Sequence, residues 1–181
     1  LIGDANEAIK AGEASLALWR DLGRTERVGR NLRQLSQLYW NQGRIAVASR
    51  YTAEAIALLE TVEPSRELAM AYATLAGQYM VVSDTAQTKI WGMRAIELAE
   101  RLDDPETICT ALNSIGSSTL CSGEEDGQAP LDRGLALAME HELEEQVARA
   151  YVNMADIKLK RCEYEAAEDF LGVSTNADER E

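Results

Sequence analysis

The hydrophobic residues of this chain recur with the spacing of amphipathic helices, and the same arrangement returns about every forty residues. Apolar side chains at Val28, Leu32 and Leu35 lie three or four residues apart, which places them on one helix face. Three columns of the repeat are Leu32, Tyr72, Leu112 and Tyr151, then Leu35, Leu75, Ile115 and Met154, then the small residues Ser36, Ala76, Gly116 and Ala155. A unit of this size cannot bury its apolar face alone, so we expect neighbouring units to stack around a continuous core.

Each repeat contains two predicted helices, here named helix A and helix B, separated by a short break. The periodicity predicts a leading helix B over 4–22, then A and B pairs over 25–42 and 44–61, 65–82 and 84–102, and 105–121 and 125–140, then a fourth helix A over 144–160 and the start of its helix B over 164–171. Gly43 and Gly123 suit the left-handed conformation that ends a helix. The predicted N-caps are Thr25, Ser65 and Asp104, with Pro105 at a first helical position.

We therefore predict an all-α fold, a right-handed superhelix of antiparallel helix pairs. It forms a single array with a half repeat over 4–22, repeats over 25–61, 65–102, 105–140 and 144–171, and a polar tail over 172–181. The chain opens without Met in the second half of a repeat, so we expect a fragment of a longer protein. Ends of that kind leave apolar residues partly uncovered, namely Ile9 and Leu16 at one end and Phe170 and Leu171 at the other. We therefore expect weak self-association through the ends.

Composition and charge narrow the classes of partner. No stretch approaches the ~18 consecutive apolar residues that span a bilayer, and no secretory leader is recognisable, so we expect a soluble cytoplasmic protein without membrane contact. The net charge is −13, and from residue 53 onward ten Lys and Arg stand against twenty-six Asp and Glu. Such a surface repels phosphates, which argues against direct nucleic-acid binding. The three cysteines, Cys109, Cys121 and Cys162, are an odd and scattered set that predicts no disulfide framework.

No group of residues in the sequence has the spacing of a catalytic or metal site. The single histidine, His141, has no cysteine or second histidine at ligand spacing. The acidic runs at 124–126 and 142–145 fall in predicted turns, where solvated acids near helix N-termini are common. No Gly-x-x-x-x-Gly-Lys-Ser/Thr loop is present to hold a nucleotide. We therefore expect a protein that is not an enzyme and that needs no cofactor or metal.

The small residue Ser36, the aromatic Tyr39, the turn residue Gly43 and the small helix B residues Ala48 and Ala55 resemble the tetratricopeptide repeat (TPR) family. The fourth repeat resembles it through Tyr151, Met154, Ala155, Tyr164 and Ala167, whereas the second and third depart from the pattern at Thr88, Gly92 and Gln128. The period of about 40 exceeds the usual ~34 residues. With its longer repeats, the chain is similar to the helical arrays of large ATP-binding bacterial transcription regulators of the LuxR type.

The TPR resemblance implies a concave groove lined by helix A residues that binds a protein or peptide. Carried over position by position, the groove residues are Arg30, Arg33, Gln37, Trp40, Asn41, Met70, Ala73, Gly77, Met80, Thr110, Asn113, Ser117, Arg149, Val152 and Asp156. This set predicts a basic end that runs into an apolar, Met-containing middle. A different interpretation places Trp40 and Met80 in the packing between repeats.

The leading hypothesis is a non-catalytic interaction or sensor segment of a bacterial transcription regulator. Two alternatives keep the same fold. One is a stand-alone scaffold or adaptor unrelated to transcription, and the other is a segment that binds a small-molecule inducer in the groove.

Overall fold

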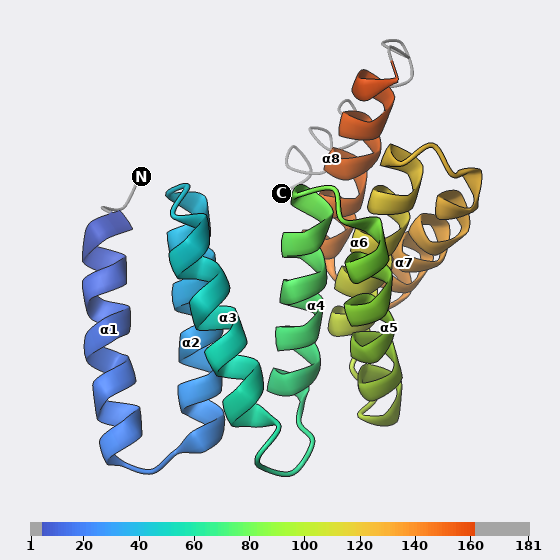
Figure 1. Cartoon of the computed structure of the whole chain (residues 1–181). Helices are drawn as coiled ribbons and strands as arrows, with labels where there is room; N and C mark the ends of the chain where they lie inside the picture. Colours follow the sequence, from blue (N-terminus) through green and yellow to red (C-terminus); the bar gives the residue numbers. More distant parts are fainter. Residues whose placement is uncertain (1–4, 162–181) are drawn as a thin grey trace, which may run out of the picture.

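The computed structural model describes residues 5–161, and this part of the chain consists of helices joined by short turns, with no strand (Figure 1). The helices are α1 (Ala5–Asp21), α2 (Thr25–Asn41), α3 (Ile45–Leu59), α4 (Arg66–Val81), α5 (Thr85–Arg101), α6 (Pro105–Cys121), the 3₁₀ turn η1 (Glu125–Gly127), α7 (Gln128–Glu140) and α8 (Glu144–Lys160). The expected all-α class is confirmed. The helix B expected over 164–171 and the tail over 172–181 lie outside the described residues.

Most helices begin and end within two residues of the ranges that the periodicity predicts. The exception is the helix expected over 125–140, which begins as the 3₁₀ turn η1 and becomes α-helical only at Gln128. The backbone is crowded there, because a Cβ atom on Gly127 would lie 2.6 Å from the carbonyl oxygen of Gly116. Pro130 falls in the first turn of α7, where its missing N–H breaks no helical hydrogen bond.

The predicted helix ends are correct in part. Gly43 and Gly123 adopt the left-handed conformation, with φ of 72° and 89°. Ser65 is an N-cap whose side chain accepts a hydrogen bond from the backbone N–H of Leu68. The prediction for Thr25 is wrong because helical hydrogen bonding starts one residue earlier, at the carbonyl of Arg24.

The other predicted cap, Asp104, lies at the N-cap position of α6 just before Pro105, but its carboxylate does not cap the backbone. It accepts a hydrogen bond from the hydroxyl of Thr107 at 2.6 Å instead. Asp104 and Thr107 are both buried, so this bond satisfies two polar groups that have lost contact with water.

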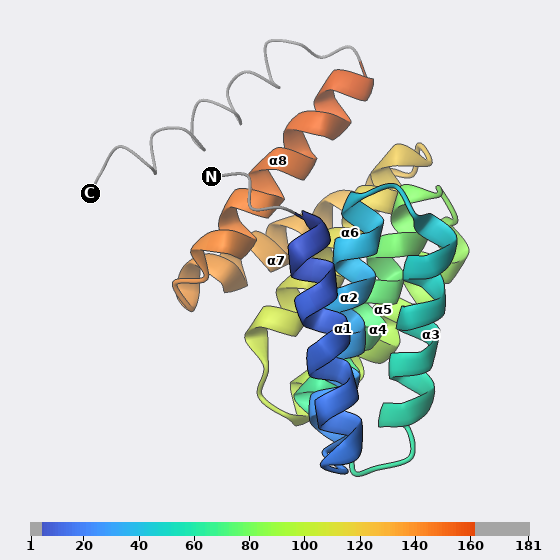
Figure 2. The same ribbon diagram turned by 90° about the vertical axis from the view of Figure 1, so that its left-hand side faces the viewer.

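Consecutive helices run antiparallel, and α8 lies obliquely to α1 and α2 when the array is seen from its N-terminal side (Figure 2). Each helix contacts the next one along the chain. In addition, α4 contacts α2 and α6, and α6 contacts α8. The small residues of the repeat are all buried between the helices. They are Ser36, Ala76, Gly116 and Ala155. The array is therefore a superhelix in which α2, α4, α6 and α8 form one inner layer.

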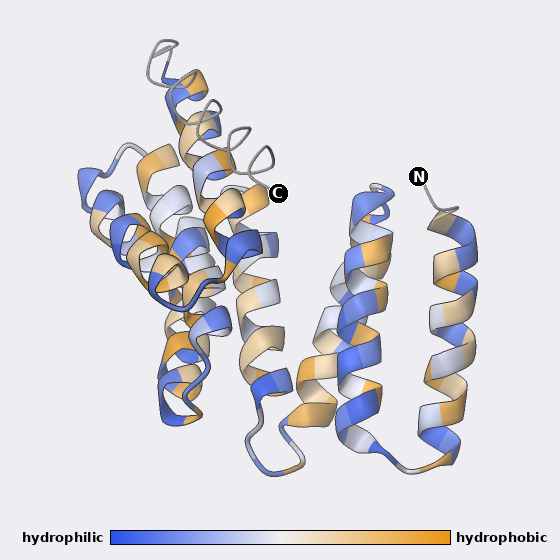
Figure 3. Ribbon diagram, turned by 180° about the vertical axis from the view of Figure 1, so that it is seen from behind, coloured by the Kyte–Doolittle hydropathy of each residue, from blue (hydrophilic) through white to orange (hydrophobic). Residues whose placement is uncertain are grey.

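Within residues 5–161, three apolar clusters follow one another along the array. The first joins α1, α2 and α3 around Leu32 and Leu35, the second runs from the end of α3 to α6, and the third joins α6, α7 and α8 around Leu131. In Figure 3, hydrophobic and hydrophilic positions alternate along α2, as the helical period requires. None of the helices in the described part of the chain is long and apolar enough to cross a membrane.

The expectation that Ile9 and Leu16 are uncovered is wrong, since their exposed fractions are 7% and 5%. Both pack in the first cluster, and α1 approaches α2 closely because Gly12 leaves room for Leu35. The large apolar side chains exposed at this end of the array are Leu18 on α1 and, just after the helix, Leu22. Phe170 and Leu171 lie outside the described residues, so self-association through the ends stays a prediction.

Candidate binding groove

The inner layer carries a groove of about 640 Å³ whose lining comes from α2, α4, α6 and α8. Helices α1, α3, α5 and α7 contribute no residue to it. The groove therefore crosses four successive A helices, and each of its walls is a helix face held by the packing behind it. It lies on the helix A side of the array, where the TPR resemblance implies a binding groove.

Most of the predicted groove residues line this space. They are Arg33, Gln37, Trp40 and Asn41 from α2, Met70, Ala73, Gly77 and Met80 from α4, Thr110 and Asn113 from α6, and Arg149 from α8. Trp40 also packs against the first apolar cluster, so lining the groove and packing between repeats are compatible roles for this side chain. Met80, which the other interpretation placed in the same packing, lines the groove and is not part of these clusters.

Four predicted residues do not line the groove. Arg30 lies 3.5 Å from Glu67 in an ion pair, Ser117 is buried inside α6, and Val152 is exposed on α8. Asp156 pairs with Lys160 one turn further along α8 at 2.6 Å. Val152 lies on another face of α8 than its neighbour Asn153, which lines the groove, and Asp156 lies beyond the last lining residue of this helix.

Several lining residues are not among those predicted from the family pattern. They are Thr74, Gln78, Val81, Glu106, Ser114, Glu145, Gln146 and Asn153. Thr74 and Gln78 lie four residues apart on α4, beside predicted positions, so a wider helical stripe would have included them. Glu106 and Glu145 come from the first helical turns of α6 and α8, which the family positions do not include.

Carboxylates offset the positive charge of the groove, so the expected basic end is not observed. Arg33 lies 3.6 Å from Glu67, the same carboxylate that Arg30 approaches. At the far end Arg149 pairs with Glu145 at 2.6 Å. The arginines predicted to attract an acidic ligand are thus already engaged with acids of this chain.

Hydroxyl and amide groups make up much of the remaining lining. The Thr110 hydroxyl lies 3.0 Å from the carbonyl oxygen of Glu106 and 3.2 Å from Oε1 of Gln146. On α2, the Gln37 amide donates to the Asn41 side chain at 2.9 Å. Asn113 is only 6% exposed, and its Oδ1 has no hydrogen-bond partner among residues 5–161. The groove thus presents many polar groups and little net charge.

The other candidate groups lie away from this groove. His141 is exposed at the C-terminal end of α7, and the acidic residues at 124–126 are exposed around η1. Cys109 and Cys121 both lie on α6, where burial raises the pKa of the Cys109 thiol to about 11. Within the described part of the chain, no three His, Cys, Asp or Glu side chains are grouped to hold a metal ion.

These features define the class of fold as a TPR-like helical repeat array with a polar concave groove. No protein-family model matches the sequence, and a search of curated proteins finds no match. Among solved structures the chain is similar to BtubC (BKLC) from P. vanneervenii, with a TM-score of 0.71 and 18% identity, covering 96% of this chain and 73% of that one. It is also similar to aspartyl phosphate phosphatase F from Bacillus subtilis, with a TM-score of 0.68 and 14% identity. That match covers 94% of this chain and about half, 49%, of the phosphatase.

Proposed function

We propose that this chain is a non-catalytic interaction segment that binds a protein or peptide along the groove of α2, α4, α6 and α8. The observation that carries the proposal is the origin of the lining, since α2, α4, α6 and α8 all contribute and none of the B helices within residues 5–161 does. Stacked repeats with small rotations between them form extended concave surfaces of this kind, which suit elongated ligands.

The chemistry of the lining favours a polypeptide over a small-molecule inducer. Small-molecule sites are mostly apolar with a few polar groups, whereas this groove is rich in neutral polar side chains. They are Gln37, Asn41, Thr74, Gln78, Thr110, Asn113, Ser114, Gln146 and Asn153. An extended chain offers a donor and an acceptor at almost every residue, which matches amide and hydroxyl side chains spread along a groove.

The proposed setting is a cytoplasmic bacterial transcription regulator of the LuxR type, and its support is the resemblance of the long repeats to the arrays of such regulators. The alternative is a scaffold unrelated to transcription. The full reading frame distinguishes them. A regulator predicts a phosphate-binding loop upstream and a helix-turn-helix downstream, and a frame with neither contradicts the proposal.

The non-catalytic part of the proposal has a direct test. The chain is incubated with acetyl phosphate, a small acyl phosphate, and the released phosphate is measured against buffer and against heat-treated protein. We expect no release above these controls. Turnover that scales with the concentration of folded protein would instead assign an enzymatic role to this array.

Binding is tested by selecting random dodecapeptides on phage against the full chain and measuring affinity for the synthesised peptide by calorimetry. Gln37→Ala removes a groove side chain from α2, and Gln34→Ala removes an exposed glutamine of the same helix that does not line the groove. We expect Gln37→Ala to weaken binding about fivefold, the value of one modest hydrogen bond, and Gln34→Ala to leave it unchanged. Equal effects of both substitutions would contradict binding in this groove.

A further inference from the structure

Gln78 on α4 takes part in both the groove and the junction between the first and second helix pairs. It lines the groove, and its Nε2 donates at 2.9 Å to the hydroxyl oxygens of Ser36 on α2 and Thr52 on α3. These two oxygens lie 2.6 Å apart, and both residues are fully buried. One amide group therefore connects three helices in the interior of the array.

The orientation of this amide follows from the hydrogen bonds around it. The Ser36 hydroxyl donates to the carbonyl of Ala48 at 2.9 Å, so its oxygen is left to accept. Only the Nε2 side of the amide can donate to it, and Nε2 therefore faces Ser36 and Thr52. Turning the amide around would bring its oxygen against the Ser36 oxygen and lose a donor in the network.

The opposite atom of the same amide is left without a partner. Gln78 is 9% exposed, and its Oε1 is buried with no hydrogen bond to any residue in the range 5–161. A buried acceptor without a donor is costly, because it has lost its hydrogen bond to water and gained none in the protein. A ligand in the groove that offers an N–H group to this oxygen removes that cost without disturbing the bonds of Nε2.

We propose that Gln78 is a specificity-determining residue of the groove that also transmits occupancy to the first helix pair. Its Oε1 accepts a main-chain N–H of the bound polypeptide, and this bond holds the amide in the orientation that ties Ser36 and Thr52 to α4. The inference rests on the proposed function, because it requires a polypeptide in the groove. Its consequence is that a ligand bound on the inner layer stabilises α3, a helix that contributes no residue to the groove.

The test is hydrogen exchange, followed by mass spectrometry, of the full chain with and without a saturating amount of the selected dodecapeptide. Because α3 does not line the groove, slower exchange over Ile45–Leu59 cannot come from direct contact with the peptide. We expect this slowing in the wild-type chain. An α3 whose exchange is unchanged at saturation would overturn the coupling while leaving the proposed function intact.

Three substitutions separate the two roles of Gln78. Gln78→Met removes both sets of bonds, and we expect peptide affinity to fall about five- to tenfold with no slowing over α3. Thr52→Val breaks the network behind the groove, and we expect affinity within about twofold of wild type, again with no slowing over α3. Ser118→Ala is the matched control. Ser118 occupies the Gln78 position one repeat later and bonds to Thr85, but it does not line the groove, so we expect both readouts to be unchanged.

Circular dichroism tests whether each variant is folded. If Gln78→Met is unfolded, Thr52→Val alone tests the transmission to α3. Retention of the α3 slowing in Thr52→Val overturns the proposed transmission through this network. Unchanged affinity in a folded Gln78→Met overturns its role in specificity. Failure to select any peptide with the wild-type chain would overturn the proposed function, and this inference with it.

Discussion

The first two junctions of the array use different chemistry at equivalent repeat positions. Between the first and second helix pairs these positions are Ser36, Thr52 and Gln78, which form a buried hydrogen-bond network. Forty residues later they are Ala76, Gly92 and Ser118. Polar groups thus connect the first two pairs, and small residues allow close packing at the next position.

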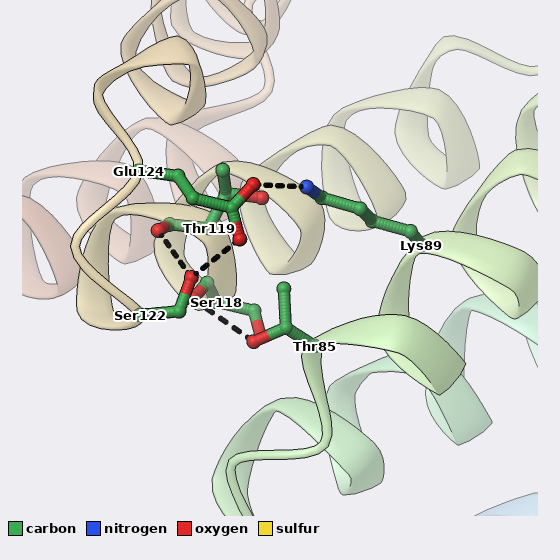
Figure 4. A network of polar contacts seen from close by, with 6 residues as sticks. All are labelled: Thr85, Lys89, Ser118, Thr119, Ser122 and Glu124. Atoms are coloured by element: carbon green, nitrogen blue, oxygen red, sulfur yellow. Dashed lines mark hydrogen bonds and ion pairs between the residues drawn. The ribbon is translucent and has the colours of Figure 1, made fainter.

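Close packing dominates the second junction. A Cβ atom on Gly92 would lie 2.6 Å from Cγ1 of Ile115, so glycine is what lets α5 and α6 approach. Polar contacts lie at the ends of these helices, where Ser118 bonds to Thr85 and Lys89 pairs with Glu124 (Figure 4). Apolar burial is therefore the main source of stability at this junction.

The difference indicates where the array can respond to a ligand. Apolar packing tolerates little change in distance, because contacts are lost outright when a gap opens. A hydrogen-bond network contributes only about 1 kcal/mol net per bond but fixes orientation, and it changes when one partner gains a new bond. The first junction is thus the adaptable one and the second the rigid one.

The largest effect is expected from Ala76→Leu at the second junction. Ala76 is fully buried between helices, so the added carbons overpack the contact and lower the free energy of unfolding by about 3 kcal/mol. Urea denaturation measures this change. Ala86→Leu, at an exposed position of α5, serves as the control and should change stability little. Equal stability of the two variants would contradict the tight packing assigned to this junction.

A smaller effect is expected from Gly92→Ala. The added methyl group meets Ile115, and the resulting strain outweighs the better helix propensity of alanine, for a net loss of about 1 kcal/mol. The same change at Gly77 has room, since the nearest atom to its Cβ would be Oγ of Ser114 at 3.6 Å. Gly77→Ala is therefore expected to stabilise the chain by about 0.5–1 kcal/mol. The comparison fails if both substitutions shift the urea midpoint in the same direction.

At the first junction, Ser36→Ala is expected to cost about 1 kcal/mol, because it removes one member of a buried network and leaves Thr52 and Gln78 with fewer partners. Ser49→Ala, on the exposed side of α3, is the matched control. Exchange rates over α3 should rise in Ser36→Ala and not in the control. A fall in stability as large as that of Ala76→Leu would show that the first junction is as rigid as the second.

The smallest effect is expected from Lys89→Ala. The pair with Glu124 raises the pKa of Lys89, but both groups are solvent-exposed, and exposed ion pairs contribute little. The melting temperature should stay that of the wild-type chain at low and at high salt. A clear decrease at low salt alone would show that the contacts in Figure 4 hold the second junction together.

The amino-acid sequence determined the helices and the face that each one buries. The 3.6-residue period depends on neighbours a few positions apart, so it could be read at Val28, Leu32 and Leu35 without knowledge of the fold. The small column through Ser36 and Ala76 likewise marks positions that are fully buried in the array. The groove residues came from the TPR resemblance rather than from the periodicity, and eleven of those fifteen line the observed groove.

Tertiary structure alone decided the charge of the groove and the double role of Gln78. Glu67 offsets Arg30 and Arg33 from a different helix pair, and Gln78 reaches Ser36 across forty-two positions of the chain. Such contacts depend on the tilt between successive pairs, which sums many small packing differences along the array. A repeat pattern specifies which residues face inward, whereas hydrogen bonds and ion pairs require distances of a few ångströms that only the packed helices set.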